Sequence, residues 1–202
     1  MFQKLALFTF ATCFAAHAAT IVSVGTPSQS GYVLNSDIVD LSWTMPYSAI
    51  DVNITANLLG QTIVSEVDAF LSTDTGPGTL PLNSVTVVNP GTLASDVVLF
   101  SGLALNAGTY HLVLHGRGDV LTVASPTTIA TDPGVTYNGS FFANGFNGTT
   151  DFNQPQASTF VPDTRDYVFA VNGTPTPAPE PASLALFATG AISLLLASRR
   201  KN

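Results

Sequence analysis

Apolar and polar residues alternate without a break over residues 50–58, and this two-residue period narrows the fold more than any other feature. Successive side chains of a β-strand point to opposite faces, so strict alternation predicts a strand with one buried face. Further segments have the composition of short strands: residues 38–44, 66–72, 83–88, 96–100, 108–115, 120–124, 135–142 and 166–172. The pattern therefore predicts an all-β protein.

Turn sequences separate these segments. They are Gly76-Pro77-Gly78, Asn89-Pro90-Gly91, Asn106-Ala107-Gly108, Asp132-Pro133-Gly134 and Asn138-Gly139. Outside the two ends of the chain, no stretch has a convincing helical period. Many short strands joined by frequent turns predict an antiparallel β-sandwich, jelly-roll-like, over residues 19–173.

The charge balance of this β-domain is acidic. The chain has 13 Asp and Glu residues against six Lys and Arg, and only Arg117 and Arg165 are basic between the terminal segments. Nucleic acids and anionic lipids are bound through basic patches, so we expect neither as a partner.

The N-terminal 18 residues have the organisation of a signal peptide. Lys4 supplies a positive charge, residues 5–16 are apolar, and Ala16-His17-Ala18 fits a cleavage site before Ala19. The single cysteine, Cys13, lies inside this segment. We therefore expect an exported mature chain that folds without disulfides.

The C-terminal segment has three parts in a fixed order. Pro179-Glu180-Pro181 comes first, an uncharged run of 17 residues (182–198) follows, and Arg199, Arg200 and Lys201 close the chain. As a helix this run would be about 25 Å long, close to the thickness of a bilayer core. The composition predicts one hydrophobic helix over residues 184–198, with the basic cluster as a membrane stop on the cytoplasmic side.

This arrangement resembles the PEP-CTERM sorting signal of exported bacterial proteins, here over residues 179–202. The resemblance implies export, transient insertion in the inner membrane, and cleavage near Pro179-Glu180-Pro181 by a membrane protease-transpeptidase, an exosortase. It also implies a final location at the surface or in the extracellular matrix of a Gram-negative-type bacterium. A plain C-terminal anchor that keeps the protein in the periplasm is the alternative.

Residues 174–178 are Pro-rich and are predicted to be an extended linker.

A second resemblance covers residues 100–114. The sequence Phe-Ser-Gly-Leu-Ala-Leu-Asn-Ala-Gly-Thr-Tyr-His-Leu-Val-Leu is similar to a stretch common in jelly-roll domains of exported bacterial proteins. It predicts a hairpin or tight turn at Ala107-Gly108 that leads into a buried strand. The resemblance implies no catalytic residues.

Few residues are candidates for chemistry. His111 and His115 would share one face of a strand, but their backbones would lie about 13 Å apart, so two separate polar-face histidines are favoured over a metal pair. Asp37 with Asp40, or Asp163 with Asp166, could bind calcium or could be solvated turn residues. No catalytic motif is present, and we expect neither an enzyme nor a cofactor.

Aromatic and amide residues are interleaved over residues 137–152. Phe141, Phe142 and Phe146 with Asn144 could form a sugar-binding surface, or the phenylalanines could pack in the core, as Trp43 is expected to do. The sequence thus predicts a non-catalytic surface or matrix protein. A carbohydrate-binding module of the exopolysaccharide matrix is the alternative.

Overall fold

The structure is a computed structural model that describes residues 18–25, 27–33, 38–60, 66–76, 79–88, 90–91, 93–117, 119–124, 127–143 and 160–176. This described part consists of strands and connecting turns, with no helix among its residues. Two antiparallel sheets are present, which confirms the prediction of an all-β antiparallel sandwich. The jelly-roll assignment stays a prediction.

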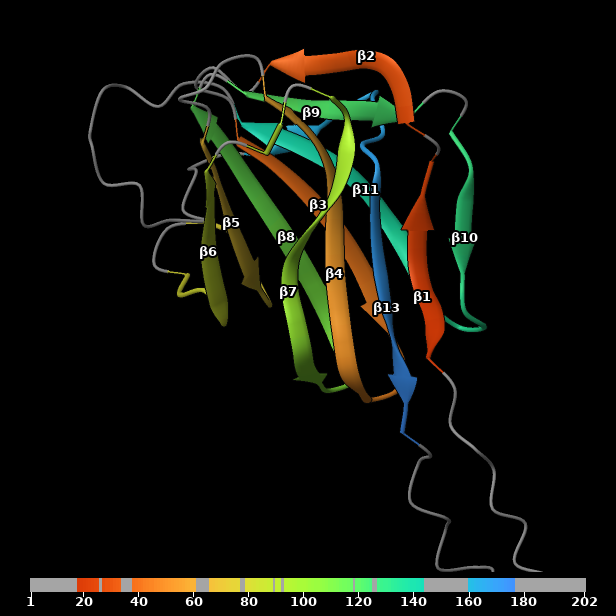
Figure 1. The fold of residues 1–202 in the computed structure, drawn as a ribbon. Coiled ribbons are helices and arrows are strands. Elements are labelled where there is room, and N and C mark those ends of the chain that lie inside the picture. The colour runs from red at the N-terminus through yellow and green to blue at the C-terminus, as the bar shows by residue number, and fades with distance from the viewer. Residues whose placement is uncertain are drawn as a thin grey trace, which may run out of the picture.

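The first sheet, sheet A, presents its strands side by side toward the viewer of Figure 1. Its order is β10 (Ile129–Thr131), β1 (Ala19–Val24), β13 (Phe169–Pro175), β4 (Ala49–Gly60), β9 (Asp119–Ala124) and β2 (Pro27–Val33). Strand β7 (Ser95–Leu105) also pairs with β4. Strand β4 is therefore the central strand of this sheet.

The second sheet, sheet B, lies behind sheet A. Its order is β12 (Val161–Pro162), β11 (Thr136–Ala143), β3 (Ile38–Met45), β8 (Gly108–Arg117), β5 (Glu66–Ser72) and β6 (Asn83–Val88). Alternate residues of its central strands, such as Leu41, Leu112 and Leu71, face sheet A and are buried. Asp40, His111 and their neighbours in register therefore lie on the opposite, outer face of sheet B.

The core between the sheets is centred on Trp43, whose side chain is fully buried. Its ring stacks on Tyr110 with centroids 5.8 Å apart and contacts Phe169 of sheet A at 6.0 Å. Because these contacts join the two sheets, Trp43 anchors the sandwich, as predicted from the sequence.

The predicted strands agree closely with the observed ones. Segments 66–72 and 83–88 are confirmed as β5 and β6 residue for residue, and the alternating segment 50–58 lies within β4. Four strands were not predicted: β1, β2, β10 and β12. The two shortest have three and two residues, all exposed, so they carry no periodic signal.

The predicted turn at Asn138-Gly139 is wrong. Strand β11 continues through both residues, and its pairing with β3 shifts register between Tyr137 and Gly139, as in a β-bulge. Gly139 has a φ of 108°, which a bulge often requires and which glycine adopts without strain. Asn138 stabilises the bulge because its side-chain amide donates to the hydroxyls of Ser42 and Thr44, both at 3.1 Å.

The turn at Ala107 is confirmed, but the hairpin alternative is wrong. Strand β7 before it pairs with β4 in sheet A, whereas β8 after it pairs with β3 and β5 in sheet B. The turn therefore carries the chain from one sheet to the other. A sequence cannot distinguish the two cases because both need the same local turn.

Candidate functional site

Both ends of the described domain lie at the same end of the sandwich. Ala19, the first residue of β1, is directly paired with Gly173 near the end of β13, and both strands reach the bottom of Figure 1. Ala18, the other residue of the predicted cleavage site, is exposed. The predicted signal cleavage site is thus adjacent to the strand that leads toward the C-terminal segment.

Strand β13 continues into the segment that the sequence assigned to the linker. Thr174 pairs with Ile50 and Pro175 with Ala49 of β4. The backbone N–H of Thr176 then donates to the carbonyl oxygen of Ser48 at 2.8 Å, and its hydroxyl donates to the same oxygen at 2.9 Å. We call this pair of hydrogen bonds the Ser48–Thr176 latch.

The predicted sorting residues follow directly after the latch. Pro179, Glu180 and Pro181, the hydrophobic residues 184–198 and the basic residues Arg199, Arg200 and Lys201 lie outside the described residues. The strands and turns that the structure describes include no helix able to cross a membrane. The hydrophobic helix and its orientation stay predictions.

The outer face of sheet B carries a second group of polar residues. Asp40 is 2% exposed, and its Oδ2 lies 2.8 Å from Nδ1 of His111. Burial raises the pKa of Asp40 above its ordinary value, and the contact with His111 offsets only part of that rise. Oδ1 of Asp40 is buried and has no hydrogen-bond partner among the described residues. Since Nδ1 of His111 faces Asp40, Nε2 is the nitrogen left for another contact.

A similar pair lies further along the same face, beyond Val113. Nδ1 of His115 is 4.0 Å from Oδ2 of Asp68, and Oδ1 of Asp68 accepts a hydrogen bond from Thr86 at 2.5 Å. The two histidines thus have different carboxylate neighbours. No group of three or more His, Cys, Asp or Glu side chains in the described ranges could hold a metal ion.

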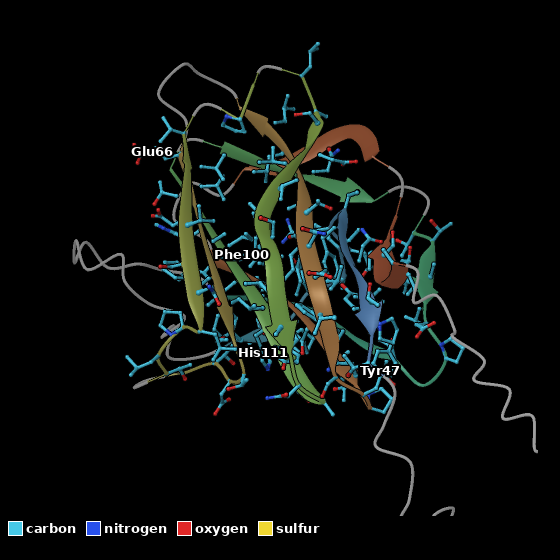
Figure 2. All side chains as sticks on the ribbon, turned by 60° about the horizontal axis from the view of Figure 1, so that its bottom comes forward. Tyr47, Glu66, Phe100 and His111 are labelled. Carbon is cyan, nitrogen blue, oxygen red and sulfur yellow. The ribbon has the colours of Figure 1, made fainter. Side chains whose placement is uncertain are left out.

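Figure 2 shows where polar residues lie along the length of the sandwich. His111 and Tyr47 come from the end that this view brings forward, and Glu66 comes from the opposite end. Tyr47 donates a 2.5 Å hydrogen bond to Asp132 at that end. Burial and the neighbouring Asp132 raise the pKa of the Tyr47 hydroxyl, so it stays protonated at neutral pH.

Three of the four acidic residues considered for calcium are described, and each has a protein partner: Asp40, Asp163 and Asp166. Oδ1 of Asp163 accepts from Nε of Arg165 at 2.9 Å and from its backbone N–H at 3.0 Å. Oδ2 of Asp163 accepts from the Tyr167 hydroxyl at 2.6 Å. Because both oxygens are engaged, Asp163 orders the chain before β13, and Asp37 lies outside the described residues.

The candidate sugar-binding residues divide between the two faces of sheet B. Phe141 is opposite Asp40 on the outer face, and Phe142 is opposite Val39 on the inner face, where the Arg165 guanidinium lies 6.0 Å from its ring centroid. Both rings are half-buried. They do not form one surface, and Asn144 and Phe146 lie outside the described residues.

Sequence reasoning did not identify the two contacts that organise these sites. Asp40 and His111 are 71 residues apart, and Ser48 and Thr176 are 128 residues apart. Ser48 takes part through its backbone carbonyl, so its residue type carries no signal. The alternation of β3 and β8 predicts that Asp40 and His111 each lie on the polar face of its own strand, but it does not show that the two strands pair and bring these side chains together.

The comparisons with known proteins identify the C-terminal segment. Residues 177–201 match the PEP-CTERM protein-sorting motif. No curated protein matches the chain. A chain of the cowpea mosaic virus top component, described as naturally occurring empty particles, is similar in structure, with 11% identity, a TM-score of 0.31, and coverage of 65% of this chain and 94% of that chain. That likeness supports no conclusion about fold or function.

The sorting motif indicates an exported protein of Gram-negative-type bacteria. Proteins with this motif are processed by an exosortase, which is a membrane protein. The motif begins at residue 177, one residue after the Ser48–Thr176 latch.

Proposed function

We propose that this chain is a non-catalytic protein of the cell surface or extracellular matrix, delivered there through processing of its sorting tail. The observation that carries the proposal is the sorting motif at residues 177–201, placed directly after a β-domain whose described residues form a hydrophobic core between two sheets. The domain is the cargo, and the tail determines where it is released or attached.

The polar groups of the domain support a structural role. A serine nucleophile needs a base within hydrogen-bond reach and an open position for the substrate. Ser42 and Ser72 flank His111 in register, but both are buried, and the Ser72 hydroxyl donates to the backbone carbonyl of Asp74 at 2.7 Å. The Asp40–His111 pair thus joins strands β3 and β8 on the outer face of sheet B, with Asp40 buried and His111 partly exposed.

The test is the intact mass of the protein from surface and culture fractions of the host, compared with a strain lacking its exosortase. We expect the mass to lack residues 1–18 and the residues after about Pro179, with the C-terminal loss dependent on the enzyme. Replacing Glu180 with alanine serves as a matched control that should retain the tail in the enzyme-containing strain. Retention of residues 184–202 in the inner membrane of both strains would instead favour a plain C-terminal anchor.

A carbohydrate-binding role is the second candidate, and one observation favours it. Phe141 and His111 belong to the same outer face of sheet B, and Nε2 of His111 is the ring nitrogen that does not face Asp40. An aromatic ring beside hydrogen-bonding groups is suited to a saccharide, because the ring stacks on C–H groups while acceptors bind hydroxyls.

Titration with oligosaccharides released from the host exopolysaccharide tests this role. We expect Phe141→Ala to weaken binding by about tenfold, equivalent to about 1.4 kcal/mol, because it removes the stacking ring. Phe142→Ala is the matched control, since its ring lies on the other face of the same strand. Equal weakening by both substitutions, or no binding to the unmodified protein, would exclude the outer face as the site.

A further inference from the structure

We infer that the Ser48–Thr176 latch must open before the sorting tail can be processed, so that the last residues of β13 control when the protein is released. The inference rests on the proposed processing by an exosortase. It concerns the regulation of that step, which the sorting motif by itself does not describe.

The first reason is distance. Thr176 is hydrogen-bonded to Ser48, and only Pro177 and Ala178 separate it from Pro179 of the motif. At about 3.1–3.3 Å per residue, Pro179 can lie no more than about 10 Å from Thr176. This is about the spacing between two packed sheets, so an enzyme that binds the motif must contact the end of the sandwich.

The second reason is the form in which proteases and sorting enzymes bind peptides. Extended peptides are held by main-chain hydrogen bonds, with side chains in adjacent pockets. The residues immediately before the motif cannot make such bonds while they pair with β4, because the Thr176 N–H already donates to Ser48 and Thr174 is paired with Ile50. They become available only when this pairing opens.

The third reason is that the structure allows the opening to stay local. The pairing of β13 with β1 extends only to Gly173, opposite Ala19. Beyond Gly173, and within the residues that the structure describes, 174–176 pair with a neighbouring strand on one side only, that of β4. Strand ends held on one side open at a lower free-energy cost than the whole fold. We expect the local opening to stop at Gly173, because the backbone there packs closely against Val52 and Ile21.

A disulfide across the latch tests the inference directly. Ser48 and Thr176 continue the register of Ala49 with Pro175, and the Thr176 N–H donates to the Ser48 carbonyl, so we expect their Cα atoms to lie about 5.5 Å apart, a separation that a disulfide can span. Cys13, in the segment removed at export, is the single cysteine of the chain, so the double variant Ser48→Cys, Thr176→Cys cannot mispair within the mature protein.

The rate of tail loss is followed by pulse-chase and intact mass in the exosortase-containing host, with cells oxidised by diamide or reduced by dithiothreitol. We expect the oxidised double variant to lose its tail at least tenfold more slowly than the reduced one. The two single variants should lose it at the wild-type rate under both conditions. Normal processing of the cross-linked chain would overturn the inference.

A second variant keeps the test independent of the disulfide. Inserting Gly-Ser-Gly-Ser after Thr176 moves the motif away from the latch, so processing of the cross-linked chain should recover with the insertion. Failure of the insertion to restore processing would contradict the steric argument. Tail retention by the wild type and the single variants would instead disprove the processing itself, which separates failure of the proposed function from failure of the latch.

Discussion

Replacing Trp43 with alanine is expected to lower the free energy of unfolding by about 3–5 kcal/mol. The side chain is fully buried, and its ring contacts Tyr110 in sheet B and Phe169 in sheet A, so the substitution leaves a cavity between the sheets. This is a large share of the ~5–15 kcal/mol that stabilises an ordinary domain. Urea unfolding of the mature protein measures the loss. The transition is followed by circular dichroism, because Trp43 is the single tryptophan of the chain and its replacement removes the tryptophan fluorescence signal.

Trp43→Phe is the matched control for the cavity. It keeps an aromatic ring against Tyr110 and removes the indole N–H, which is buried and has no hydrogen-bond partner in the part of the chain that the structure describes. We expect Trp43→Phe to lower the free energy of unfolding by less than half as much as Trp43→Ala. The phenyl ring fills part of the cavity, and removing an unpaired buried donor is itself favourable. Equal losses for the two variants would show that ring packing contributes little to holding the sheets together.

Replacing Asp163 with alanine is expected to lower the free energy of unfolding by about 2–3 kcal/mol. The carboxylate side chain is only 3% exposed, and it accepts hydrogen bonds from Arg165 and from the buried hydroxyl of Tyr167. Its loss removes the acceptor that orders the chain before β13. Asp166→Ala is the control. Among the described residues, Asp166 accepts one long hydrogen bond, of 3.3 Å from Tyr137, so this substitution should lower the free energy of unfolding by less than Asp163→Ala does.

The contribution of Asp163 is expected to depend on pH with a defined sign. Burial raises the pKa of this carboxyl, but the hydrogen bonds from Arg165 and Tyr167 lower it by more, so its pKa in the folded protein is below the ordinary value. The stabilisation is therefore present above the unfolded pKa of about 3.9 and is lost as the pH falls through the folded pKa. The difference in unfolding free energy between wild type and Asp163→Asn should shrink as the pH falls from about 5. A constant difference would contradict the assignment of a charged Asp163.

Much of the fold could be predicted because its signals are local. Alternation identified β4, and composition with flanking turns identified β5 and β6 at their observed bounds. Short exposed strands such as β10 were not predicted, because three residues are too few to show the two-residue alternation of a strand. The Asn138-Gly139 pair was misread because a bulge and a turn use the same residue types, and only pairing with β3 distinguishes them.

The candidate sites were less predictable than the strands. The sorting tail is a linear signal, so its three parts were readable from the order of residues 179–202, and the motif match confirms it. The sugar-binding hypothesis rests on aromatic and amide residues interleaved over 137–152, yet Phe141 and Phe142 are neighbours on one strand and therefore face opposite sides. The linker was predicted from proline content, but Thr174 and Pro175 pair with β4.

The all-β class, most strands and the sorting signal could be predicted from the sequence, because side-chain alternation, turn residues and the order of charges are local features. The pairing partners and the register of the strands became clear from the folded structure alone. That pairing placed Asp40 beside His111 and Ser48 beside Thr176, across 71 and 128 residues of chain. The physical reason is that register follows from packing the whole core around Trp43, and no local segment contains that information.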